Sequence, residues 1–178
     1  MPTALQRQYA SLERQRSGLL QHLGTYSEVQ QAFLPRPESW SLAGVVQHLV
    51  LVEEVFVRTG RREAGMRPAL VRLRSRLALR MVLGVLGRDV RIRAPVAAVI
   101  PSVHVPLAQL GPRWEAARSD LLAYLAELPG PTRARTAFFH PRTGWLTATS
   151  GLRFVAAHCD HHRRQIDRIV ASAGFPSR

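Results

Sequence analysis

The stretch that decides the fold is Gly151–Ile169, GLRFVAAHCDHHRRQIDRI, a proline-free segment whose apolar residues recur at helical spacing. An α-helix turns by about 100° per residue, so His158 and His162 project from one face, one turn apart. Two imidazoles in this arrangement can share one metal ion. Two nitrogen ligands rarely fix a functional metal, and we expect the third from His48, which lies on another strong helical pattern.

His161 competes with His162 as the partner of His158, because it lies three residues further along the same predicted helix. Helical geometry rotates it about 60° to one side, whereas Gln165 continues the direction of His158 and His162. We therefore interpret His158 and His162 as the ligands. His161 is then a catalytic candidate behind them or at the pocket rim. Gln165 either orients a ligand or touches the substrate, unless it is an ordinary polar residue of the helix surface.

Apolar spacing, capping residues and prolines predict an all-α chain. The predicted helices are Ala4–Leu23, Leu42–Arg58 after an N-cap at Ser39 or Ser41, an amphipathic Pro68–Leu86 whose apolar residues oppose its arginines, Pro112–Leu128 and Thr147–Ala173. Between them we expect an irregular connection over Ala94–Pro106, with a short strand at Val96–Val99 as an option, and a loop over Thr132–Leu146. Four long core helices joined by long connections favour a four-helix bundle.

Length and composition fit one globular domain over residues 1–178. The single cysteine excludes an internal disulfide framework and favours a cytoplasmic protein. No apolar run approaches the roughly 20 residues of a membrane span, and the first residues lack the apolar segment of a secretory signal.

Arginine dominates the charge of the chain. The net charge is +13, all 25 basic residues are arginine, and ten of them fall between Arg61 and Arg93, where the only acids are Glu63 and Asp89. Such a segment can attract nucleic acid, anionic lipid or an anionic small molecule. A solvated basic surface is the simpler interpretation.

Three further residues invite a chemical role. Glu53 is a candidate general base, although a glutamate in the middle of a helix is usually solvated. Cys159 points about 100° away from His158 on the helix, so a buried, inert thiol is the favoured interpretation. His140 precedes a proline in the predicted loop, where it either lines the mouth of a cavity or lies on the surface.

Two groups of residues resemble the DinB/YfiT-like superfamily. Trp40-Ser41-Leu42, followed by Gln47-His48-Leu49 and Glu53, resembles the second-helix signature of that family. The family's last loop and fourth helix are similar to His140-Pro141-x-x-Gly144-Trp145-Leu146-Thr147 and His158-x-x-x-His162-Arg163-x-Gln165-Ile166. The resemblance spans roughly Trp40 to Ile169. Residues 61–106 match nothing in the family pattern and look like a basic insertion that enlarges the connection between the second and third core helices.

The resemblance implies a four-helix bundle whose second and fourth helices supply three histidines to one divalent metal. Carried over by position, these are His48, His158 and His162. Family members include transferases and isomerases that use low-molecular-weight bacterial thiols, with zinc and nickel as metals, and many members form homodimers.

Residues and resemblance together predict a metal-dependent enzyme. Three neutral imidazoles leave metal positions for water or substrate, as in catalytic sites. We expect a thiol transferase or a small-molecule hydrolase. The alternative is a non-catalytic, stress-related bundle that binds nucleic acid or another polyanion through Arg61–Arg93, and a third option is a family member whose histidines hold a structural metal or none.

Overall fold

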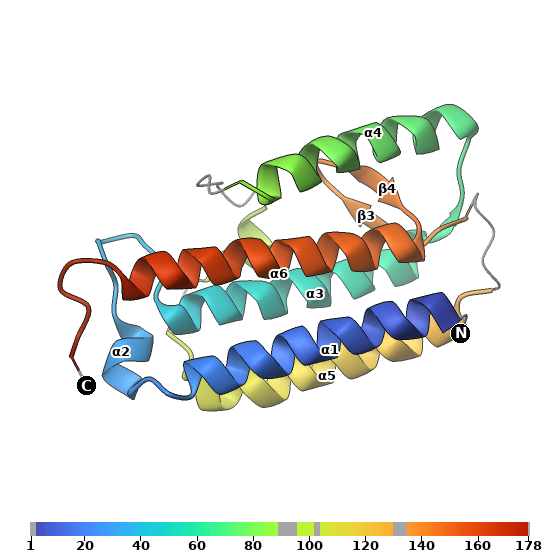
Figure 1. Cartoon of the computed structure of the whole chain (residues 1–178). Helices are drawn as coiled ribbons and strands as arrows, with labels where there is room; N and C mark the ends of the chain where they lie inside the picture. Colours follow the sequence, from blue (N-terminus) through green and yellow to red (C-terminus); the bar gives the residue numbers. More distant parts are fainter. Residues whose placement is uncertain (1–2, 89–95, 102–103, 130–134, 178) are drawn as a thin grey trace.

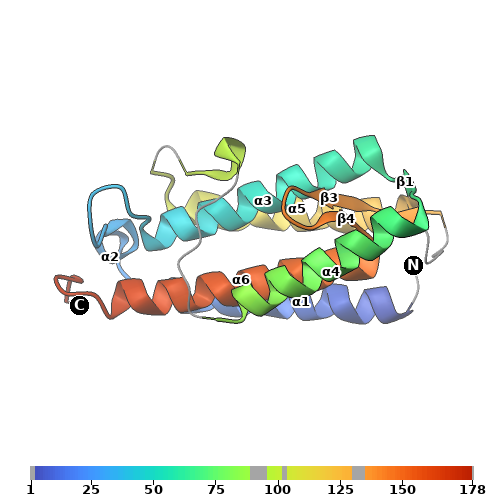
Figure 2. The ribbon, with the colours of Figure 1, turned by 90° about the horizontal axis from the view of Figure 1, so that it is seen from above.

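The computed structural model describes the chain except for residues 1–2, 89–95, 102–103, 130–134 and 178. Four long helices form the bundle: α1 (Thr3–Leu23), α3 (Leu42–Glu63), α5 (Leu107–Glu127) and α6 (Ala148–Val170). Helix α3 packs on α5 and α6, and α1 packs on α6 and α5, so each helix has two neighbours (Figures 1 and 2). The predicted all-α bundle is confirmed.

The connection between α3 and α5 is the enlarged one that the sequence predicts. It contains strand β1 (Gly65–Met66), helix α4 (Ala69–Leu86) and a 3-10 helix, Ala97–Val99. The optional strand at Val96–Val99 is therefore wrong, and residues 94–95 and 102–103 of the predicted irregular segment lie outside the described residues. Helix α4 lies on the outside of the bundle, across a short hairpin and α6 (Figure 1).

That hairpin corrects the loop predicted over Thr132–Leu146, of which residues 132–134 lie outside the described residues. Strands β3 (Phe138–His140) and β4 (Gly144–Leu146) pair antiparallel, and β2 (Arg135–Thr136) pairs antiparallel with β1. The hairpin lies between α3, which contacts β3, and α4, which contacts β4. Strands of two or three residues are too short to show the alternation by which a strand is recognised in a sequence.

The helix boundaries follow identifiable caps. Ser41 and Thr147 are the N-caps of α3 and α6, and their hydroxyl oxygens accept hydrogen bonds from the backbone N–H groups of Gly44 and Ser150. Helix α5 begins five residues before the predicted start, so Pro112 lies inside it rather than at its N-terminus. A short helix that the sequence analysis missed, α2 (Glu28–Ala32), is closed by a capping box between Ser27 and Gln30.

Two glycines let the hairpin approach the bundle closely. A Cβ atom on Gly60 of α3 would lie 2.5 Å from the carbonyl oxygen of Ala137, and one on Gly151 of α6 would overlap the ring of Phe138. The Phe138 ring is fully buried and stacks on Phe56 of α3 with a centroid distance of 4.4 Å. The hairpin is thus packed directly against the backbones of α3 and α6.

No helix among the described residues is long and apolar enough to cross a membrane.

Candidate metal centre

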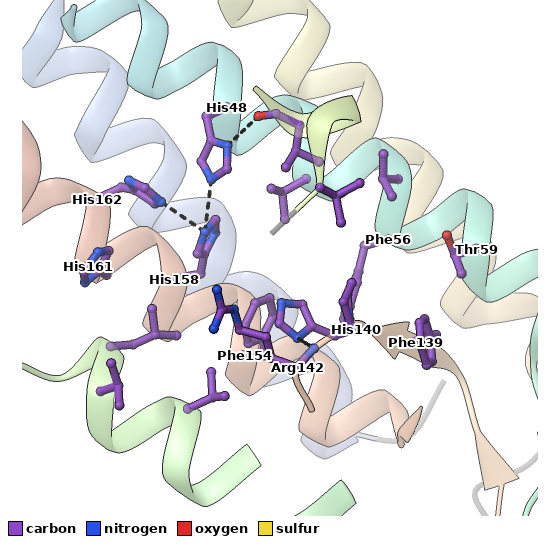
Figure 3. Close-up of a pocket in the computed structure, with 18 of the residues that line it drawn as sticks. His48, Phe56, Thr59, Phe139, His140, Arg142, Phe154, His158, His161 and His162 are labelled. Atoms are coloured by element: carbon purple, nitrogen blue, oxygen red, sulfur yellow. Dashed lines mark hydrogen bonds between the residues drawn. The ribbon is translucent and has the colours of Figure 1, made fainter. Parts of the chain in front are cut away.

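Three histidine rings from two helices converge at one point. His48 projects from α3, and His158 and His162 project from successive turns of α6 (Figure 3). The Nε2 atom of His158 lies 3.0 Å from Nε2 of His162 and 3.3 Å from Nε2 of His48. The available ligand atoms of the three residues all lie within 4.8 Å of one another. The structure therefore brings together the three residues that the sequence analysis selected.

The spacing of these nitrogens fits a shared metal ion. Nitrogen ligands lie about 2.0–2.1 Å from zinc, so two of them are separated by about 3.3 Å in a tetrahedral site and about 2.9 Å at a right angle. The two Nε2 separations of 3.0 and 3.3 Å fall in this range. Imidazole suits zinc and nickel among other divalent ions. The group could hold such an ion.

Hydrogen bonds to the opposite ring nitrogens orient two of the three rings. Nδ1 of His48 lies 2.6 Å from the carbonyl oxygen of Val99, in the 3-10 helix. Nδ1 of His162 lies 2.7 Å from Oε1 of Gln165. Each Nδ1 donates its proton to an oxygen, which leaves the Nε2 lone pair directed at the centre. Such outer partners fix the tautomer and orientation of metal-binding histidines.

Burial keeps the imidazoles in the neutral form that binds cations. Desolvation, followed by repulsion from neighbouring histidines, lowers the pKa of His162 to about 3 and that of His158 well below its usual value. Desolvation likewise lowers the pKa of His48 to about 4, although the hydrogen bond to Val99 opposes it. At neutral pH all three rings therefore present lone pairs, and no proton has to leave before a metal enters.

The three histidines lie in the wall of a cavity of about 680 Å³. Most of its lining is apolar and comes from α3, α4 and α6, including Val52, Phe56, Val82, Leu86 and Phe154. The size and apolar character are those of a small-molecule site. Among the described residues, the polar side chains of the lining other than the three histidines are Thr59, His140, Arg142 and His161, and the tryptophan N–H of Trp40 adds a donor.

His140 lines the cavity from strand β3, which confirms the first of its two interpretations. Its Nδ1 atom accepts hydrogen bonds of 3.3 Å from the backbone N–H groups of Arg142 and Thr143. The neutral ring therefore carries its proton on Nε2, as a hydrogen-bond donor. Burial, with repulsion from Arg142, lowers the pKa of His140 to about 4, so this donor stays uncharged at neutral pH.

His161 and Gln165 lie where the helical pattern places them. His161 is buried, lines the cavity, and meets the ring of His162 edge to face at a centroid distance of 5.2 Å. Gln165 is half-buried and its Oε1 atom accepts a hydrogen bond from Nδ1 of His162, while its role in orienting a metal ligand stays a prediction. Sequence reasoning missed the carbonyl of Val99 and the side chain of Arg142. A backbone carbonyl has no signature in a sequence, and Arg142 fell at an unassigned position of the loop motif.

Glu53 lies elsewhere, and it is not solvated. Its carboxylate is buried between α3 and α5 and is not part of the cavity lining. Nε of Arg118 donates to it at 2.5 Å, Nη2 of Arg118 at 2.8 Å and Nε1 of Trp114 at 3.0 Å. With both oxygens bonded, this residue joins two core helices. The solvated interpretation was wrong because Arg118, 65 positions away, supplies the missing counter-charge.

Cys159 is buried, as the sequence analysis favoured. Desolvation raises the pKa of its thiol to about 12, so the reactive thiolate is scarce at neutral pH. Cys159 therefore lacks the lowered pKa of an activated nucleophile.

The chain is similar to a known protein family. A sequence model described as the DinB superfamily matches residues 11–166, which include all three converging histidines. No curated protein and no solved structure matches the chain significantly.

Proposed function

The chain belongs to the DinB superfamily, and from this we propose that it is an enzyme that binds one divalent metal through His48, His158 and His162. The observation that carries the proposal is the convergence of three Nε2 atoms, each on a ring kept neutral by burial. An apolar cavity beside them offers room for a small-molecule substrate. Zinc and nickel are the proposed ions, because imidazole nitrogen suits both.

The proposed reaction is the transfer of a low-molecular-weight thiol to a small electrophile, with hydrolysis of a small molecule as the second choice. A divalent ion held by three imidazoles lowers the pKa of a bound thiol or water and polarises a substrate oxygen. Both reactions need a nucleophile at neutral pH, and no side chain of the described cavity lining is itself an activated nucleophile.

The residues of the chain contribute binding, orientation and exclusion of water. The apolar walls from α3, α4 and α6 remove water from an apolar substrate. Nε2–H of His140 is an uncharged donor for a substrate oxygen, and the Arg142 guanidinium attracts an anionic group. Gln165 and the Val99 carbonyl hold two of the rings, so the site is organised before substrate arrives.

Metal analysis of protein expressed without an affinity tag tests the ligand assignment. We expect about one divalent ion per chain, and its loss when any one of His48, His158 or His162 is replaced by alanine. His22→Ala is the matched control, because His22 is exposed on α1, and it should leave the metal content unchanged. Stoichiometric metal in the triple alanine variant would refute the assignment.

Activity assays separate the two reactions. Metal-loaded protein is incubated with a low-molecular-weight thiol and a panel of small electrophiles, and consumption of both compounds is followed by mass spectrometry. A transferase consumes thiol and electrophile in equal amounts, whereas a hydrolase consumes its substrate with no thiol present. Either activity should disappear in the His158→Ala variant and persist in His22→Ala.

A further inference from the structure

Helix α4 presents an apolar stripe to the solvent. Its members are between 39 % and 74 % exposed: Leu70, Leu73, Leu77, Met81 and Val85. They account for half of the large apolar residues that are exposed in the described part of the chain, so the exposure is concentrated on one element. Soluble surfaces carry scattered apolar residues, but an aligned group of this size marks a contact surface.

The stripe results from the direction in which α4 packs. Its buried residues are Ser75, Leu79 and Leu86, and the Ser75 hydroxyl accepts a hydrogen bond from the backbone N–H of Trp145 in the hairpin. At about 100° per residue, Leu70, Leu73 and Leu77 lie on the far side of the helix from these contacts. Met81 and Val85 are exposed as well, but they also line the cavity beside the three histidines. The N-terminal part of the apolar face that the sequence predicts for this helix therefore points outward, and its C-terminal part borders the cavity.

Arginines flank the stripe. Arg72, Arg76 and Arg80 follow one another at four-residue spacing and form a row along one edge, and Arg74 lies near the N-terminal half of the stripe. The segment Ala69–Leu86 contains no aspartate or glutamate, so α4 carries four positive charges and no negative one. An exposed helix with leucine and methionine on one face and arginine beside it has the composition of a helix that lies in a membrane interface.

Charge decides which partner fits. A second copy of the chain would bring two such arginine rows together, with no carboxylate on either helix to pair with them. Nucleic acid would satisfy the arginines but leave the leucines facing charged phosphates. The surface of an anionic bilayer satisfies both, because its headgroups attract arginine and its acyl region accepts the apolar side chains.

We propose that α4 docks on the surface of anionic lipid membranes, with its apolar stripe in the interface and its arginines among the headgroups. The helix lies on the outside of the bundle, beyond the hairpin, and so is open to a flat surface (Figures 1 and 2). Binding is peripheral: the helix keeps its contacts to the hairpin and α6, and only its outer face enters the interface.

Vesicle co-sedimentation of the full-length protein tests the proposal. The vesicles are phosphatidylcholine alone, or phosphatidylcholine with about a third replaced by phosphatidylglycerol. The first variant replaces the stripe residues Leu70, Leu73 and Leu77 by glutamine, and the second replaces Arg72, Arg76 and Arg80 by glutamine. One basic residue near an anionic surface contributes about fivefold to binding, so the arginine variant should bind about a hundredfold more weakly.

Matched variants control for general loss of apolar or basic surface. Val29→Gln with Leu34→Gln removes two exposed apolar residues far from α4. Arg7, Arg14 and Arg153, replaced by glutamine, remove three exposed arginines from α1 and α6. Metal content and circular dichroism show whether each variant keeps its fold.

The proposal is supported if the protein binds anionic vesicles more tightly than neutral ones, and both α4 variants lose this binding while both controls keep it. Absence of binding to anionic vesicles overturns it, and so does binding that survives the stripe variant. If the wild type does not bind vesicles, sedimentation velocity tests for a second copy as the partner. A wild-type dimer that becomes a monomer in the stripe variant would identify that partner. Equal binding of labelled DNA by wild type and stripe variant, without vesicle binding, would identify nucleic acid. Both outcomes overturn the proposal.

Discussion

Replacement of Gln165 by leucine should weaken metal binding without disturbing the bundle. The side chain is half-buried on the last turns of α6, and its Oε1 atom accepts the Nδ1–H of His162 at 2.7 Å. Leucine has a similar volume and good helix propensity but cannot accept a hydrogen bond. In the variant the Nδ1 of a buried ring is left without its partner, and the ring can turn or change tautomer.

The expected loss of affinity follows from the geometry. The hydrogen bond contributes about 1 kcal/mol, which is about fivefold in affinity. Outer partners of metal-binding histidines typically contribute ten- to a hundredfold, because they also raise the basicity of the ring and fix its orientation. Besides this hydrogen bond, the ring of His162 packs against Trp40 and His48, so we place the effect near the lower limit, at about tenfold.

The assay is competition for zinc against a chromophoric chelator at constant pH. Gln165→Glu is the informative partner variant, since it keeps an acceptor oxygen and adds a charge, and it should bind zinc at least as tightly as the wild type. Asp167→Asn changes an exposed residue of the same helix and should have no effect. Equal zinc affinity of wild type and Gln165→Leu, or weaker binding by Gln165→Glu than by Gln165→Leu, would refute the orienting role.

Three further predictions concern the protein as a whole. The metal-free protein should lose stability as pH falls below about 6.5. In the folded state the pKa values of His48 (about 4) and His162 (about 3) lie below those of the unfolded chain, so between these values only the unfolded chain binds the protons. Each ring lowers the free energy of unfolding by up to about 1.4 kcal/mol per pH unit in that range. Equal thermal unfolding midpoints of chelator-treated protein at about pH 7.5 and 5.5 would contradict this prediction. Arg118→Met leaves the carboxylate of Glu53 buried and unpaired, so urea unfolding should show a loss of about 3–5 kcal/mol, much of it restored when Glu53→Leu is added. The Cys159 thiol, with its pKa raised to about 12, should resist alkylation in the native protein and react fully in urea; rapid reaction under native conditions would show that this part of the core opens.

The sequence predicted the convergence of the three histidines better than the surroundings of these residues. His158 and His162 are four residues apart in a proline-free segment, so helical periodicity alone places them on one face. His48 required the further inference that an imidazole on an apolar face meets them across the bundle, and the resemblance to the family supported it. The N-caps Ser41 and Thr147 follow from side-chain chemistry that acts within three residues.

Features that depend on distant partners were not predictable in this way. The burial of Glu53 depends on Arg118, and the orientation of His48 depends on a carbonyl that any residue at position 99 would supply. The outward face of α4 is a matter of packing direction, because an amphipathic pattern shows that a helix has an apolar side but not what covers it. In α5, Pro112 looks like a helix start because proline favours that position, yet five residues before it continue the helix.

The two glycines that admit the hairpin have a consequence for the metal centre. Gly60 lies twelve residues from His48 on α3, which is about 18 Å along the axis, and Gly151 lies seven residues from His158 on α6. Both histidine-bearing helices therefore contact the start of the same hairpin, at Ala137 and Phe138, several turns away from the imidazoles. A methyl group added at Gly60 or Gly151 should shift one helix relative to the other, and so change the spacing of the three imidazoles from positions that do not contact them.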